Sequence, residues 1–151
     1  MNCVLHSHCA GDKAIPKSTQ KEIEAAIKAI TVKPAPKAAP KIRDAFLAHL
    51  KSSGWSGEVA VSMDSDMTIT SMKDNVGLCM QTGNMARMYA DMIKLQTMYL
   101  DNAIKSAAIV VPSQPMAALL GDNIAQSTRL ERELAIFRKA YHVPTLIFAL
   151  E

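Results

Sequence analysis

Long hydrophobic runs are missing from this sequence of 151 residues. No apolar stretch approaches the roughly 18 residues that a membrane-spanning helix needs, so we expect no association with a membrane. The start of the chain, residues 1–13, also lacks the apolar core of a secretory signal. We therefore expect a cytoplasmic protein.

Cysteine is scarce too, with thiols only at Cys3, Cys9 and Cys79. Three thiols cannot all pair, and a reducing compartment requires no disulfide. Cys79 lies in an apolar segment, where a cysteine usually behaves as a small buried hydrophobe. The alternative role for Cys79 is a nucleophile, which would need a base beside it.

A large excess of one charge is also absent. The 17 basic and 14 acidic side chains leave a net charge of +3. Nucleic-acid-binding proteins usually gather their basic residues on one face, so this composition permits DNA binding without establishing it. With 49% apolar and 21% charged residues, the chain has the composition of a folded globular domain.

Periodicity is missing from the first part of the chain, and we interpret residues 1–17 as a flexible leader. Four side chains of the kind that bind metals lie close together there, at Cys3, His6, His8 and Cys9. Their spacing matches no known zinc module, and a flexible segment organises ligands poorly. We therefore expect this segment to bind no metal.

Helical patterns open the remaining part, residues 18–151, which we interpret as one domain. Apolar residues recur at helical spacing over residues 18–30, and Thr19 and Glu22 suggest a capping box at the start. A basic, alanine-rich link follows, with prolines that prevent helix and strand pairing. A second helix is expected from Pro40 to the glycine cap at Gly54.

Strand patterns begin after this helix, and a tight turn at 74–75 predicts a hairpin. A long helix then runs to Leu100, and two more strands alternate with helices. This order favours parallel strands joined by right-handed helical crossovers. We therefore predict an α/β fold with a mixed sheet in a three-layer sandwich. The expected strands cover residues 59–63, 67–71, 76–82, 105–112 and 143–150, and the later helices cover 115–120 and about 127–141.

The hairpin is the first place where function is expected. A two-residue turn at 74–75 pairs Thr70 with Cys79 across the two strands, and cross-strand partners project from the same face. Thr68 and Gln81 share that face because side chains alternate along a strand. The spacing therefore predicts one polar face carrying these four residues.

The sequence of this region resembles a known family. The segment Val76–Asn84, VGLCMQTGN, is similar to the strand that holds a Glu-x-Gln element in the BglII-type and BstYI-type restriction endonucleases, which belong to the PD-(D/E)xK nucleases. The order of elements over residues 20–151 is similar as well. The resemblance implies a restriction-endonuclease-like core, double-stranded DNA as partner, a homodimer, and Mg²⁺ as the cofactor of an active enzyme.

The resemblance also implies that the metal-binding carboxylates have been replaced. The glutamate of the family falls on Cys79, its glutamine on Gln81, and its first aspartate on Thr70. A thiol and a hydroxyl are poor ligands for Mg²⁺, so we predict a degenerate active site and expect no cofactor. Asp64 and Asp66 are weak substitutes, because Asp66 lies about 13 Å along the strand from Thr70.

The long helix after the hairpin carries a polar stripe. Asn84, Arg87, Asp91 and Lys94 lie on one helical face. The resemblance places Asn84 at the start of the helix that approaches DNA, where Asn84, Arg87 and Lys94 would contact phosphates or a base edge. The alternative is a solvated face with local ion pairs around Asp91.

Three functions are consistent with these features. The first is a restriction-endonuclease-like domain that binds DNA or forms a homo-oligomer without cutting. The second is an active Mg²⁺-dependent type II deoxyribonuclease with an altered site. The third is a module that binds a small ligand or a protein through the hairpin face. We expect the first, because Thr70 and Cys79 replace both acids of the metal site.

Overall fold

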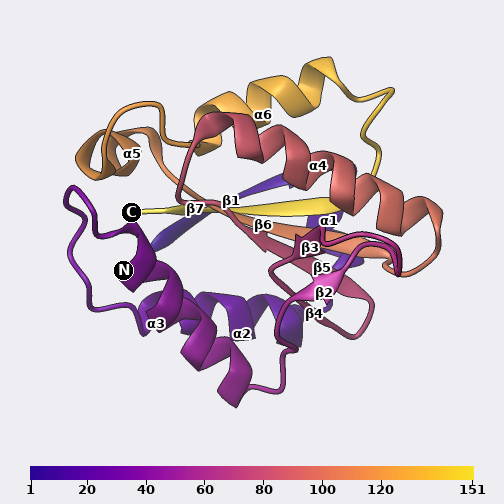
Figure 1. Ribbon diagram of the computed structural model, residues 1–151, viewed down its shortest axis with the longest axis horizontal. Helices are drawn as coiled ribbons and strands as arrows, with labels where there is room; N and C mark the ends of the chain where they lie inside the picture. Colours follow the sequence, from indigo (N-terminus) through magenta and orange to yellow (C-terminus); the bar gives the residue numbers. More distant parts are fainter.

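A five-stranded mixed sheet lies at the centre of the protein. In a computed structural model that describes residues 1–151, the strand order is β1-β7-β6-β5-β4. Strands β5, β6 and β7 are parallel, while β1 and β4 pair antiparallel with their neighbours (Figure 1). The strands are β1 (Cys3–His8), β4 (Ser71–Lys73), β5 (Val76–Met80), β6 (Ser106–Pro112) and β7 (Thr145–Leu150).

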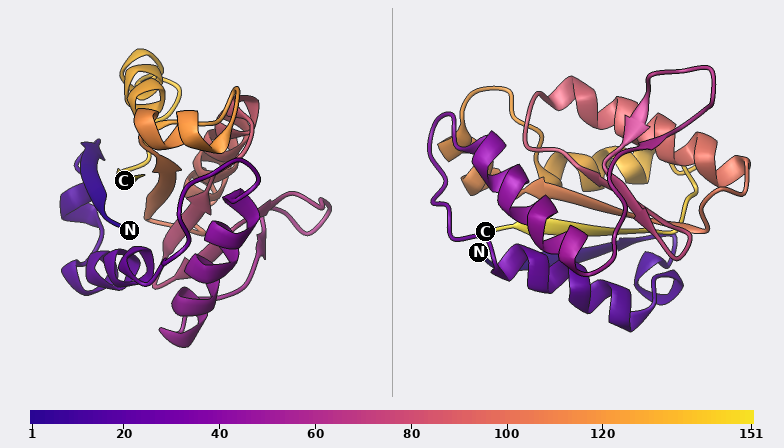
Figure 2. Two further views of the ribbon diagram at one scale, coloured as in Figure 1. Left: turned by 90° about the vertical axis from the view of Figure 1, so that its left-hand side faces the viewer. Right: turned by 60° about the horizontal axis from the view of Figure 1, so that its bottom comes forward.

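Helices cover both faces of this sheet. Helices α2 (Lys17–Lys28) and α3 (Ala39–Ser52) lie on one side, and α4 (Met85–Leu100) and α6 (Ser127–Ile136) lie on the other (Figures 1 and 2). The predicted three-layer α/β sandwich is therefore confirmed. None of the helices is long and apolar enough to cross a membrane. The short elements are α1 (Gly11–Ala14), α5 (Gln114–Leu120) and a separate two-stranded sheet of β2 (Val59–Ala60) and β3 (Thr68–Ile69).

Strand β6 shows why the sheet forms where the apolar runs predict it. Every residue of this strand is buried. Ala108 and Val110 belong to the core on the α2–α3 side, whereas Ala107, Ile109 and Val111 belong to the core on the α4–α6 side. A parallel strand covered on both faces needs apolar side chains at every position, which is the pattern of this segment.

The start of the chain differs from the prediction. Strand β1 pairs with β7 along its whole length, from Cys3↔Leu150 to His8↔Thr145, and α1 follows it. A side chain on Gly11 would collide with the backbone of Thr145, so α1 packs directly on β7. The flexible leader expected over residues 1–17 is therefore wrong for residues 3–8 and 11–14. Strand β1 is stabilised by backbone pairing with β7, so it forms without the strong apolar alternation in the sequence that would have predicted a strand.

The histidines and cysteines of β1 have separate partners. His6 Nδ1 lies 3.1 Å from Glu131 Oε2, and His8 Nε2 lies 3.0 Å from the carbonyl oxygen of Tyr141. Cys9 Sγ contacts the same His8 nitrogen at 3.3 Å. No three His, Cys, Asp or Glu side chains of the chain are placed to hold a metal ion.

Helix α2 begins differently from the predicted capping box. Its N-cap is Pro16, which offers no side-chain hydrogen bond, and Thr19 is buried inside the first turn. Gln20 Nε2 instead donates to the carbonyl oxygens of Asp12 and Ile15 at 2.8 and 2.7 Å. The carboxylate of Glu22 turns toward the sheet, where it accepts hydrogen bonds from Lys73 and the Trp55 indole. Tertiary contacts thus replace the local cap.

Candidate functional site

The hairpin between β4 and β5 has the predicted register. Asp74 and Asn75 have φ values of 48° and 62°, as a two-residue hairpin turn requires at both central positions. The pairs are Ser71↔Leu78, Met72↔Gly77 and Lys73↔Val76. Extended by one residue, this register sets Thr70 opposite Cys79.

Regular pairing stops before Thr70 is reached. The preceding residue, Ile69, pairs with Val59 in the small second sheet, so the chain changes direction at Thr70. Thr70 is only 7% exposed, and its hydroxyl oxygen accepts a hydrogen bond from the backbone N–H of Met80 at 3.0 Å. The Thr70 side chain therefore satisfies the main chain of β5.

Cys79 is buried, as its place in an apolar segment predicts. It is 1% exposed and belongs to the apolar core that includes Met88 and Ile109. Burial raises the pKa of the Cys79 thiol far above its ordinary value, and the negative charge of Asp91 raises it further. Cys79 is thus a neutral core residue beneath the predicted polar face. The thiol has none of the thiolate character that a nucleophile requires.

A cavity of about 580 Å³ opens at the carboxyl end of β5, between α3 and α4. Thr68, Thr70 and Gln81 of the predicted face line it, but Cys79 does not. Two arginines, a lysine and two acids bring charge to the walls. The charged lining residues are Arg43, Glu58, Arg87, Asp91 and Lys94.

Asp91 is the centre of a hydrogen-bond network in this cavity. Its Oδ2 atom accepts a hydrogen bond from Gln81 Nε2 at 3.0 Å, and its Oδ1 atom accepts one from Lys94 Nζ at 3.2 Å. The other end of the Gln81 amide accepts a hydrogen bond from the Gly83 N–H at 3.0 Å. Asp91 is 8% exposed, and each oxygen of this buried carboxylate accepts one hydrogen bond.

The sequence pattern predicted a surface ion pair for Asp91 but not its position beside Gln81. A signal was present, because Asp91 lies seven residues after Asn84 on the face of α4 that begins next to the hairpin. The expected ion pair with Lys94 is formed. Asp91 is buried in the cavity wall, so the interpretation of this helical face as solvated is wrong for Asp91.

The remaining predicted DNA-contacting residues lie on the same helix. Arg87 is exposed at the cavity wall. Asn84 is exposed at the start of α4, where its side-chain oxygen caps the helix by accepting a hydrogen bond from the Ala86 N–H at 2.8 Å. From the opposite wall, Arg43 donates to the carbonyl oxygen of Met80 at 3.0 Å and lies 3.5 Å from Glu58. Three cations therefore face two carboxylates.

The donor atoms in the cavity are a poor fit to a magnesium ion, because both carboxylates that line it, Glu58 and Asp91, are paired with cations. Mg²⁺ needs octahedral oxygen ligands, usually including one or two free carboxylates. The Thr70 hydroxyl is bonded to the main chain, and both Asp91 oxygens are bonded to Gln81 and Lys94. Asp64 and Asp66 are exposed in the loop between β2 and β3 and do not line the cavity.

Comparison with known proteins assigns this fold and chain to a family. No curated protein matches the sequence, but the family model described as restriction endonuclease BglII/BglIII matches residues 3–150. The crystal structure of restriction endonuclease BglII complexed with a DNA 16-mer superposes with a TM-score of 0.84 at 14% identity, covering 99% of this chain and 76% of that one. Free BglII superposes with a TM-score of 0.76 at 13% identity, covering 100% and 80%. The resemblance inferred from Val76–Asn84 is thereby confirmed, and the chain belongs to the BglII/BglIII restriction endonuclease family.

Proposed function

We propose that this protein binds duplex DNA along the cavity face and does not cleave it. The observation that supports the proposal most directly is the set of cations at the cavity, Arg43, Arg87 and Lys94, in the fold that BglII uses in its complex with DNA. Positive side chains that contact phosphates release counterions from DNA, and this provides affinity without any metal.

The absence of cleavage is proposed from the chemistry of the hairpin. Phosphodiester hydrolysis in this class needs a cation that polarises the phosphate and activates a water molecule. The two positions that correspond to the acids of the family carry a bonded hydroxyl at Thr70 and a buried thiol at Cys79. Losing several kcal/mol of transition-state stabilisation would slow the reaction by orders of magnitude.

Helix α4 would supply most of the DNA contacts. Lys94 is held in place by Asp91, whereas Arg87 is exposed and free to reach a phosphate. Asn84 stands at the amino end of α4, where backbone N–H groups and the helix dipole favour an anion. These three residues lie on one face of α4, so a single strand of DNA could pass all of them.

The test is the affinity for a short duplex at two salt concentrations. We expect binding that weakens steeply with salt, and we expect Arg87→Ala to reduce the slope of log K against log salt by about 0.9, one phosphate contact. Arg138→Ala, at an exposed site after α6, is the matched control and should leave the slope unchanged. No binding by the wild type at low salt would remove DNA from the function.

The competing hypothesis is a relocated active site, because Asp91 is an acid beside Gln81. Supercoiled plasmid incubated with Mg²⁺ or Mn²⁺ should stay intact under our proposal. Nicking that disappears in Asp91→Asn would contradict the proposal and would identify an altered metal site on α4.

We also propose that two copies associate through α4 and α6. A groove of about 280 Å³ lies between α4 and the segment that follows α6, lined largely by apolar residues such as Tyr89, Met92 and Phe137. Ile93 in the groove lining and Ile136 at the end of α6 are 68% and 66% exposed, and exposed apolar surface of this kind commonly marks a protein interface. Sedimentation should give a dimer for the wild type and a monomer for Ile93→Glu. A wild-type monomer at high concentration would contradict this.

A further inference from the structure

The loop that joins α2 to α3 belongs to a segment of unusual charge. Residues 28–43, here called the basic segment, contain five of the 17 basic side chains of the protein and none of its 14 acidic ones. The five are Lys28, Lys33, Lys37, Lys41 and Arg43. Such a density of one charge in a chain with a net charge of only +3 indicates a surface for an anionic partner.

The backbone of the basic segment is anchored to the core. Ile30 and Ala38 are buried, and Val32 packs against the core between them. The ammonium group of Met1 donates to the carbonyl oxygen of Ile30 at 3.1 Å, and the Ala38 N–H donates to the carbonyl oxygen of Ala35 at 3.0 Å. The prolines in the segment further restrict the backbone, so little conformational entropy is left to lose on binding.

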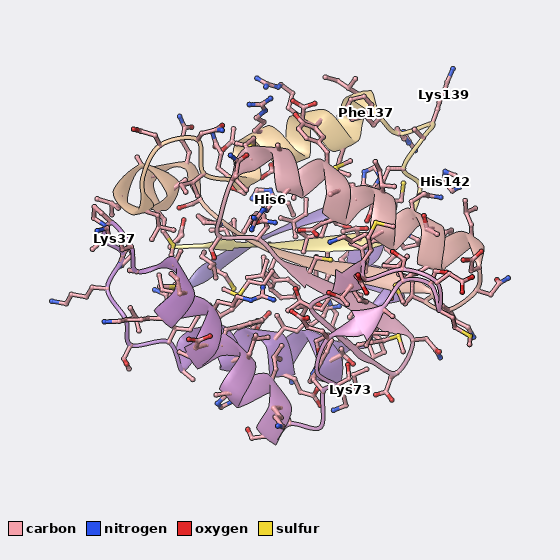
Figure 3. All side chains as sticks on the ribbon, viewed as in Figure 1. His6, Lys37, Lys73, Phe137, Lys139 and His142 are labelled. Atoms are coloured by element: carbon pink, nitrogen blue, oxygen red, sulfur yellow. The ribbon has the colours of Figure 1, made fainter.

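The lysines of the segment point away from this anchor. Lys33, Lys37 and Lys41 are exposed, and none of them takes part in any of the six ion pairs of the protein. Lys37 has a φ of 67° in the turn before α3 and lies at the outer margin of the molecule (Figure 3). Three uncompensated charges are therefore displayed from a fixed backbone.

The basic segment is continuous with the cavity. Its last part forms the start of α3, where Ala39, Pro40 and Arg43 line the cavity wall opposite α4. A strand of DNA that contacts Arg87 and Lys94 would therefore meet this lysine-rich loop as it leaves the cavity.

We propose that the basic segment is a second DNA-contacting surface, which binds the phosphate backbone next to the cavity without reading sequence. This inference rests on the proposed DNA binding and extends it to a part of the chain outside the cavity. An anionic membrane is a weaker fit, because no large apolar side chain of residues 28–43 is exposed to enter lipid.

The test compares two triple variants that remove the same net charge. Lys33→Gln, Lys37→Gln and Lys41→Gln together should reduce the slope of log K against log salt by about 2.7, three phosphate contacts. The control combines Lys13→Gln, Lys105→Gln and Lys139→Gln, which are exposed and lie toward the amino ends of the parallel strands, away from the cavity. The control should keep the wild-type slope. Thermal melts of both variants should match the wild type, because all six side chains are exposed.

Three results separate the possible failures. Wild-type protein that does not bind DNA at low salt would overturn the proposed function, and the inference with it. Wild-type binding with equal slopes for the two variants would overturn the inference alone. Tighter binding to phosphatidylserine vesicles than to DNA, lost only in the basic-segment variant, would replace the DNA backbone by a lipid surface and would also overturn it.

Discussion

Two walls of the cavity, one formed by the β4–β5 hairpin and one by α4, differ in what their polar groups are bonded to. On the hairpin wall, the Thr70 hydroxyl is bonded to the backbone of β5, and the Cys79 thiol lies beneath this wall in the core, outside the cavity lining. On the helix wall, Asp91 and Lys94 are charged, paired with each other and held next to Gln81. The hairpin wall is thus neutral and the helix wall is charged, although both surround the same space.

This difference separates two requirements that an active nuclease must satisfy together. Cleavage needs acids that can hold a cation, whereas binding needs positive charge that can meet phosphates. Under the proposed function, the hairpin wall lacks the first, whereas the helix wall supplies the second through Arg87 and Lys94. The proposal therefore requires a binding surface that persists without the acids of the metal site.

The largest expected effect comes from placing an acid beneath the hairpin wall, at the position where the resemblance puts the glutamate of the family. Cys79→Glu should lower the free energy of unfolding by about 3–5 kcal/mol, because the new carboxylate would be buried without a partner. Urea denaturation at neutral pH measures the change, and Cys79→Val is the control that keeps the site apolar. An unchanged unfolding free energy would mean that the site is open to water or a cation.

A smaller effect is expected from neutralising the helix wall. Asp91→Asn should lower the free energy of unfolding by about 1–2 kcal/mol, because it disrupts hydrogen bonds to a buried charged group. It should also tighten DNA binding at low salt, because the cavity loses a negative charge. Glu58→Gln is the matched control at the other cavity acid, whose side chain is 62% exposed. It should tighten DNA binding while leaving stability nearly unchanged.

The sequence predicted the register of the hairpin better than the depth of its side chains. The Asp74–Asn75 turn set the hairpin register because two residues with positive φ leave little choice of pairing. The same reasoning placed Cys79 on one face with Gln81, but it did not show that the thiol is buried in the core and does not line the cavity. Periodicity assigns a side to each residue of a strand, but the depth of a side chain depends on the packing of distant elements.

Strand β1 and the buried position of Asp91 also depend on contacts with other parts of the chain. Strand β1 carries exposed Val4 and Leu5 and depends on backbone pairing with β7, more than 130 residues away in sequence. Asp91 becomes a buried network group only because Gln81 and Lys94 close over it. The pairing of β1 with β7 leaves no local pattern in the sequence, and the spacing on α4 indicates the Asp91–Lys94 pair but not the burial of Asp91 beside Gln81.

The smallest expected effect concerns an ion pair outside the cavity. This ion pair joins α2 to strand β4 of the hairpin. Lys73 of β4 lies 2.8 Å from Glu22 of α2, and its hydrogen bond lowers the pKa of the Glu22 carboxyl below its ordinary value of 4.5. A lowered carboxyl pKa adds stability above the unfolded-state pKa, and this stability is lost as the pH falls below about 4.5 toward the folded-state value. Glu22→Gln should therefore lower the melting temperature at pH 7 and flatten its decline below pH 4.5. A decline below pH 4.5 as steep in Glu22→Gln as in the wild type would mean that the acid sensitivity of the fold does not come from the attachment of α2 to the hairpin.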